Sequence, residues 1–90
     1  MHNNRFEGFE KDLEFVKWRG EHGYKDGYTI WSKGSFSIRI EYREEVMDYM
    51  FCLYFRVYRE FKFELDSFHL TFDEALTRFY EIIGETEDQN

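Results

Sequence analysis

The segment Tyr49–Tyr58, with the sequence YMFCLYFRVY, constrains the fold of this chain more than any other. Side chains alternate between the two faces of a β-strand, and here both alternating sets are largely apolar. One set contains Phe51 and Leu53, and the other contains Met50 and Cys52. A strand that is apolar on both sides is typical of a position where both faces are covered. We therefore predict a sheet in which this segment is a central strand.

A hairpin is predicted immediately before this strand. Ser35–Arg43 alternates between apolar and polar residues, and Tyr28–Ser32 is rich in residue types that favour strands. The Lys-Gly pair at 33–34 supplies a two-residue turn between them. This turn would place Trp31 opposite Phe36 on the buried face of the hairpin.

A fourth strand is predicted at Phe61–Leu65, after a connection at residues 44–48 and the central strand. Its two phenylalanines and its leucine would face the core, while Lys62 and Glu64 would face outward. Residues 58–60 contain no glycine, proline or asparagine to mark a turn. We predict a three-residue loop there, and a single bent strand is the alternative.

A helix is predicted at each end of the chain. Residues 4–19 repeat apolar side chains every three to four positions, and Asn4 followed by Glu7 resembles a capping box. Phe15 and Trp18 fall outside this repeat, so a strand over Leu13–Arg19 is the alternative. Thr71 followed by Glu74 forms the same pattern before the second apolar stripe.

The second helix is expected to end at Gly84. The acidic residues 85–90 would then form a frayed tail. The predicted architecture is α-β-β-β-β-α, an α+β fold with a single antiparallel sheet of about four strands flanked by an N-terminal and a C-terminal helix. Residues 1–90 would make one domain. Two helices would cover only one face of this sheet, which leaves a mixed aromatic and charged face open.

The distribution of charge narrows the choice of partner. The net charge is −7, and residues 44–90 carry 4 basic against 12 acidic residues, whereas residues 1–43 carry 8 against 7. An acidic domain is repelled by nucleic-acid phosphates and by anionic lipid surfaces. We therefore expect another protein with a basic surface as the partner, with no direct binding of nucleic acid and no membrane contact. The lone cysteine and the absence of a signal-like apolar stretch favour the cytoplasm.

No motif in the chain indicates catalysis. None of His2, His22 and His69 lies at metal-ligand spacing from another histidine or from a cysteine. Cys52 lies in the most apolar strand, where a buried side chain is expected rather than a nucleophile. We therefore expect neither an enzyme nor a metal or cofactor site.

In outline, the small size and acidic composition resemble those of phage-encoded inhibitors of host defence nucleases, such as anti-CRISPR proteins, and of toxin immunity proteins. The resemblance implies steric block of a basic cleft by carboxylates that stand where phosphates would bind. The side chains that we expect to contact the partner are Glu41, Tyr42, Glu44, Glu45, Asp48 and Tyr49. A second candidate patch consists of Glu81, Glu85, Glu87 and Asp88.

Three alternatives stay open at this point. The apolar strand suits a homodimerising structural or accessory module, in which a second copy covers the sheet. The second alternative is a protein that binds a small apolar or aromatic ligand between the sheet and a helix, although the cavity would destabilise so small a core. The open sheet face could also bind single-stranded nucleic acid by stacking its bases, although the acidic excess of the second half opposes this. The basic residues that could interleave with Tyr54 and Tyr58 are Arg39, Arg43, Arg56, Arg59 and Lys62.

Overall fold

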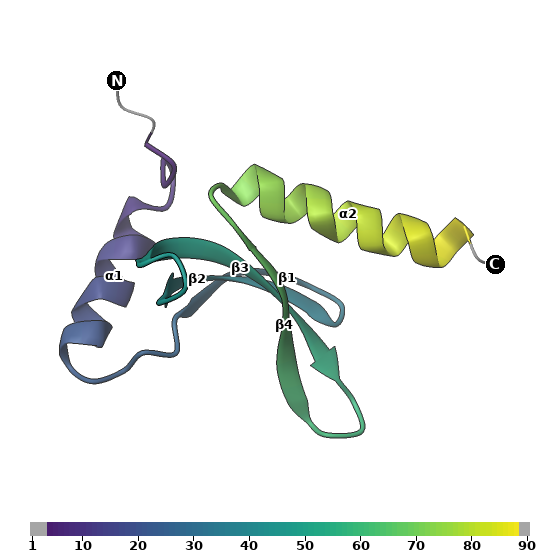
Figure 1. Ribbon diagram of the computed structural model, residues 1–90, viewed down its shortest axis with the longest axis horizontal. Coiled ribbons are helices and arrows are strands. Elements are labelled where there is room, and N and C mark those ends of the chain that lie inside the picture. Colours follow the sequence, from purple (N-terminus) through teal and green to yellow (C-terminus); the bar gives the residue numbers. More distant parts are fainter. Residues whose placement is uncertain (1–3, 89–90) are drawn as a thin grey trace.

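The computed structural model of the chain describes residues 4–88, with their side chains as far as residue 84. The four strands form one antiparallel sheet in the order β1-β2-β3-β4, and a helix precedes and follows them (Figure 1). This is the predicted α+β architecture. In chain order the elements are α1 (Glu10–Glu21), β1 (Tyr28–Lys33), β2 (Phe36–Arg43), β3 (Asp48–Val57), β4 (Lys62–His69) and α2 (Phe72–Asp88).

Strand β3 is central, as its sequence predicted, and its residues Met50–Leu53 are buried on both faces of the sheet. Phe51 and Leu53 have no exposed surface and face the helices, while Cys52, also fully buried, and Met50, 5% exposed, point the other way. Fully burying side chains of this size contributes about 1.5–3 kcal/mol each. The strand therefore anchors the fold from both sides.

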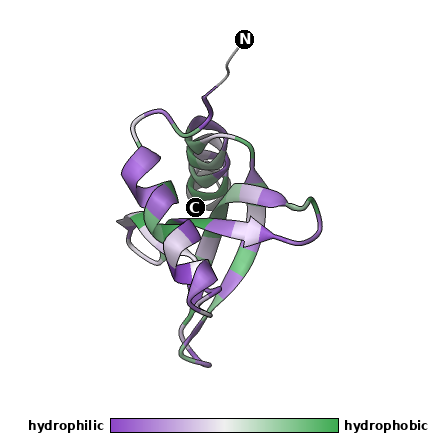
Figure 2. Ribbon diagram, turned by 90° about the vertical axis from the view of Figure 1, so that its left-hand side faces the viewer, coloured by the Kyte–Doolittle hydropathy of each residue, from purple (hydrophilic) through white to green (hydrophobic). Residues whose placement is uncertain are grey.

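Both helices pack on the same face of the sheet, which we call the inner face. Helix α2 contributes Ala75 and Phe79, and α1, whose ribbon is mostly hydrophilic in Figure 2, contributes Val16. The opposite face, which no helix covers, is the outer face. It carries Ser37, Arg39, Glu41 and Arg43 from β2, Met50, Cys52, Tyr54 and Arg56 from β3, and Phe63, Leu65 and Phe68 from β4.

The first helix begins at Glu10, so the predicted start at residue 4 is wrong. Gly8 adopts a φ of +89°, a conformation that ends any helix and that few side chains tolerate. The predicted capping box is absent, because the Asn4 side chain accepts a hydrogen bond from the N–H of Phe6 at 3.1 Å in a turn. This turn inserts Phe6 into the core, where its ring stacks on Phe51 at 4.9 Å between centroids.

The β1–β2 hairpin forms with a different register from the one predicted. Its two-residue loop is residues 34–35, and Gly34 takes a φ of +59°. Trp31 therefore lies opposite Ile38 instead of Phe36. Its ring remains on the inner face and meets Phe79 edge-to-face at 5.0 Å, so its place in the core is as expected.

The β3–β4 connection is longer than predicted by one residue, and this reverses the faces of β4. The turn occupies residues 58–61, and Lys62 is the first residue paired with β3, opposite Val57. A shift of one residue exchanges the two faces of a strand. Phe63 and Leu65 consequently lie on the outer face, contrary to the prediction. The alternative of a single bent strand is not observed.

Helix α2 begins as predicted but does not end as predicted. The Thr71 hydroxyl accepts a hydrogen bond from the N–H of Glu74 at 3.2 Å, and the Glu74 carboxylate binds the same hydroxyl at 3.1 Å. The helix passes through Gly84 and continues to Asp88, so residues 85–88 are helical instead of frayed. A glycine weakens a helix by about 1 kcal/mol without ending it. The last two residues of the predicted tail lie outside the described part of the chain.

Candidate functional site

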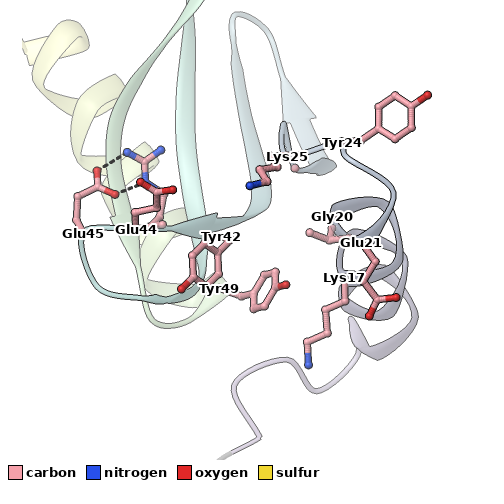
Figure 3. A pocket seen from close by; sticks show the side chains of 12 residues that line it. Lys17, Gly20, Glu21, Tyr24, Lys25, Tyr42, Glu44, Glu45 and Tyr49 are labelled. Atoms are coloured by element: carbon pink, nitrogen blue, oxygen red, sulfur yellow. Dashed lines mark hydrogen bonds and ion pairs between the residues drawn. The ribbon is translucent and has the colours of Figure 1, made fainter.

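An open cleft of about 800 Å³ lies between α1, the loop that follows it, and the adjoining end of the β2–β3 hairpin (Figure 3). It brings together four of the six residues that the sequence predicted as contacts: Tyr42, Glu44, Glu45 and Tyr49. Glu41 and Asp48 do not line it. The remaining lining residues are Val16, Lys17, Gly20, Glu21, Tyr24, Lys25, Gly27 and Arg43.

Two tyrosines form one wall of the cleft. Tyr42 of β2 and Tyr49 of β3 are cross-strand partners, and their rings meet edge-to-face at 5.3 Å between centroids. The Lys17 ammonium of α1 lies 5.6 Å from the centre of the Tyr49 ring, which shows that this wall accepts a cation. Burial raises the pKa of Tyr49, so its hydroxyl stays protonated and able to donate a hydrogen bond.

The arginine beside this wall neutralises part of the predicted acidic cluster. The Arg43 guanidinium donates hydrogen bonds to both carboxylate oxygens of Glu45 and, at 2.7 Å, to Glu41. The hydrogen bond with Glu45 is the largest cause of the raised pKa of Arg43, and the same bond lowers the pKa of Glu45. The charge of Glu45 is therefore largely compensated within the chain.

The carboxylates of Glu41 and Asp48 are engaged in contacts within the chain, so they are less available to a partner. Glu41 is 7% exposed on the outer face, where the Tyr54 hydroxyl binds its two carboxylate oxygens at 2.8 Å each. The Asp48 carboxylate holds the Arg5 guanidinium at 2.8 Å and accepts the N–H of Tyr49 at 2.7 Å. Glu44 is exposed, and within the described residues it has neither a hydrogen bond nor an ion pair with its side chain.

The cleft has a balanced charge. Its lining contains three cationic side chains, Lys17, Lys25 and Arg43, and three carboxylates, Glu21, Glu44 and Glu45. Because Arg43 already engages Glu45, the carboxylates left for an outside group are Glu21 and Glu44. The site therefore offers two separated carboxylates beside an aromatic wall. This is fewer than the four clustered carboxylates that the sequence predicted.

Sequence reasoning missed the contribution of α1 to this site. Lys17 and Glu21 are four residues apart, a spacing that places them on one side of a helix. That spacing was readable from the sequence. Their position facing the β2–β3 hairpin was not, because it depends on how α1 crosses the sheet.

A second group of exposed rings lies on α1 and the start of β1. Phe15 and Trp18, 42% and 55% exposed, stack at 6.3 Å, and Tyr28 meets Phe15 edge-to-face at 5.1 Å. The Trp18 ring also contacts His22 at 4.4 Å. Both α1 residues fall outside the apolar stripe of the helix, a spacing from which their exposure could have been read.

The surroundings of Cys52 and Ser67 bear on whether either side chain could act as a nucleophile. Cys52 is fully buried, and burial raises the pKa of its thiol to about 12, which keeps it protonated at neutral pH. The Ser67 hydroxyl donates to Asp66 at 2.7 Å, and its oxygen also contacts His69 Nε2 at 2.8 Å. The hydroxyl proton is thus directed to Asp66. Nucleophilic catalysis would need it directed to a histidine base. No group of three candidate metal ligands occurs within residues 4–88.

Comparisons with known proteins return no relative: no protein-family model, no curated protein and no solved structure matches the chain. Within the described residues, neither helix combines the length and the apolar character needed to cross a membrane. A functional assignment therefore depends on the chemistry of the surface.

Proposed function

We propose that this chain is a protein-binding inhibitor or neutraliser whose partner presents a basic surface. The observation that carries the proposal is the aromatic wall of Tyr42 and Tyr49 beside the carboxylate of Glu44, which is unpaired among the described residues. Exposed tyrosines are enriched among the residues that dominate binding energy at interfaces. A neighbouring free carboxylate suits a lysine or arginine of the partner.

The wall itself supports a cationic partner group. Lys17 lies above the Tyr49 ring, and Tyr42 is 44% exposed beside it. An incoming arginine that stacked on Tyr42 would find Glu44 close by along the chain. Cation–π contacts at partly desolvated sites contribute about 0.5–2 kcal/mol, and a charge-assisted hydrogen bond about 1.5–3 kcal/mol.

The overall charge would act at longer range. Segment α2 contains six acidic residues and one arginine, a formal charge of −5 out of the −7 of the chain. Such a field accelerates encounter with a basic surface and weakens as salt is added. Block of a basic cleft, as in a nuclease or a nucleic-acid-binding toxin, would then combine steering by α2 with anchoring at the tyrosine wall.

The test is capture of a partner from nuclease-treated lysate, followed by affinity measurement with the purified partner. We expect Glu44→Lys to weaken binding at least tenfold, because it replaces the free carboxylate with a like charge. Glu7→Lys is the matched control, since Glu7 is exposed outside the cleft and the change in net charge is the same. Equal effects of the two variants, or recovery of no stoichiometric partner, would overturn the proposal.

A homodimerising accessory module is the second candidate. The observation in its favour is the tip of the β3–β4 hairpin, where Phe61 is 83% and Phe63 47% exposed. Exposed aromatic rings at one place mark contact surfaces. The mass of the chain in solution separates this candidate from the first.

A further inference from the structure

The acidic excess of the chain does not extend to the outer face of the sheet. The strongly acidic helix α2 packs on the inner face through Ala75 and Phe79. The residues of β2 and β3 on the outer face include three arginines, Arg39, Arg43 and Arg56, and two carboxylates, Glu41 and Asp48. Glu41 is buried and bound to Tyr54 and Arg43, and Asp48 is paired with Arg5 at 2.8 Å, so neither carboxylate strongly repels an incoming anion. The sheet thus separates an acidic layer from a basic one.

Each of the three arginines lies over an aromatic ring. The guanidinium carbon of Arg39 is 4.4 Å from the centre of Tyr54 and 5.4 Å from that of Phe63. Arg56 lies 5.2 Å from the Tyr58 ring in the same way. Within the described residues, neither Arg39 nor Arg56 forms an ion pair, and Arg39 Nε is buried without a hydrogen-bond partner. These cations remain available to an anion from outside.

The tip of the β3–β4 hairpin continues this basic surface. It projects away from both helices (Figure 1), with Tyr58 62% exposed. The nearby carboxylates of Glu60 and Glu64 are both engaged by Lys62, at 2.8 Å and 3.7 Å. Arg59 has no ion pair within the part of the chain that is described. We name the combined region the arginine–aromatic surface, and it consists of Arg39, Tyr54, Arg56, Tyr58, Arg59 and Phe63.

We propose that the arginine–aromatic surface binds single-stranded nucleic acid. Open sheet faces with exposed rings stack unpaired bases, and guanidinium planes both stack on bases and bind phosphates. Tyr54 and Arg56 both lie on the outer face of β3, two positions and so about 7 Å apart, and Tyr58 follows them in the turn after the strand. The acidic excess that opposed this function in the sequence lies mainly on α2, across the sheet.

An acidic peptide is the competing occupant, and the rings distinguish the two. A peptide carboxylate needs the arginines but gains little from Tyr58 or Phe63. A nucleotide strand needs both, because stacking supplies much of its affinity. The net charge of −7 limits this affinity, and we expect a dissociation constant on the order of 10 μM in 50 mM salt.

The experiment is fluorescence anisotropy of the full chain with a labelled twelve-nucleotide oligo-dT. Arg39, Arg56 and Arg59 can each contact one phosphate. The plot of log affinity against log salt should therefore have a slope of about −2, at roughly 0.7 per phosphate contact. Tyr58→Ala should weaken binding at least fivefold, while Tyr58→Phe, which keeps the ring, should change it less than twofold. Arg56→Gln should weaken binding and lower the salt slope by about 0.7.

Two matched controls lie on the helices. Tyr80→Ala removes a tyrosine of α2 that is 53% exposed, and Lys11→Gln removes an exposed cation of α1. Neither should change the affinity, and circular dichroism confirms that every variant is folded. Absence of binding at 100 μM protein, or equal loss with Tyr58→Ala and Tyr80→Ala, would overturn the proposal. If oligo-glutamate displaces the labelled oligo-dT as well as unlabelled oligo-dT does, and Tyr58→Ala has no effect, the partner of this surface is an acidic protein and not a nucleic acid.

Discussion

At the scale of single residues, Glu41 shows that the alternation of residues along a strand predicts the face of a side chain but not its burial or its contacts. Its position in the alternating segment predicted an outward side chain, and the structure confirms that it lies on the face without helices. That face is nevertheless dense enough to bury it, because Tyr54 and Arg43 close over the carboxylate. The neighbouring Glu44, of the same chemistry, stays exposed. The difference arises from cross-strand contacts, which sequence spacing does not encode.

Removing the Glu41 carboxylate should destabilise the fold. Glu41→Ala leaves the Tyr54 hydroxyl without its partner and removes one of the two acids that hold Arg43. We expect a loss of about 2–4 kcal/mol in the free energy of unfolding, measured by urea denaturation. Tyr54→Phe, which removes only the donor, should cost about 1–2 kcal/mol.

Glu44→Ala is the control for Glu41→Ala, because it deletes an exposed carboxylate three positions away. Its effect should lie within about 0.5 kcal/mol of zero. If the two alanine variants unfold at the same urea concentration, the three-residue contact of Glu41, Arg43 and Tyr54 does not stabilise the protein.

At the scale of elements, the sequence predicts the helices and strands whose apolar residues alone show which sides are buried. Segment β3 is apolar on both sides and α2 has a continuous stripe, so each has one way to be covered. The faces of β4 depended instead on the length of one loop, and no residue between 58 and 61 fixes that length. The start of α1 depended on Gly8, whose positive φ overrode an apolar repeat that extended through it.

The Asp66–Arg78 pair joins the bulge of β4 to α2 and should make the stability depend on pH. Burial alone would raise the pKa of Asp66, but hydrogen bonds from Arg78 at 3.1 Å and from Ser67 outweigh it and lower this pKa. The contribution is therefore present above the ordinary value of 3.8 and is lost as the pH falls through the lower folded value. Asp66→Asn should cost about 1–2 kcal/mol at pH 7.

Unfolding of the two proteins across the acid range checks this assignment. The difference in unfolding free energy between wild type and Asp66→Asn should be constant above about pH 5 and should shrink toward pH 2.5. A difference that is the same at both ends of the range would mean that ionisation of Asp66 does not contribute.

Two glycines should respond to alanine in opposite directions. Gly84 lies inside α2, and a β-carbon added there would meet no atom of a neighbouring element within 4 Å, so Gly84→Ala should stabilise the protein by up to about 1 kcal/mol. Gly27 has a φ of +73°, and a β-carbon there would stand 2.7 Å from the carbonyl oxygen of Ile40. Gly27→Ala should destabilise by more than about 1 kcal/mol. Thermal unfolding decides both signs, and a stabilising Gly27→Ala would contradict the close approach of this loop to β2.

At the scale of the whole molecule, the distribution of charge between layers matters more than its sum. The composition predicted an acidic protein and a protein partner, and four of the six predicted contact residues do line one cleft. The rest of that cleft comes from α1, the loop after it and Arg43, and three of the predicted carboxylates are engaged by arginines of the same chain. Pairing of this kind depends on the fold, so a count of charges along the sequence overstates the acids that face a partner.

The two candidate functions predict different masses in solution, and we expect a monomer of 11.2 kDa. A stable interface buries about 800 Å² per partner, roughly one-eighth of the 6557 Å² surface of this chain. On the outer face Met50 and Cys52 are already covered within the chain, which leaves mainly Phe61 and Phe63 exposed on a narrow hairpin tip. Light scattering coupled to size exclusion between 10 and 200 μM measures the mass directly. A dimer that Phe61→Ser dissociates, while Tyr80→Ala leaves it intact, would make self-association the leading function.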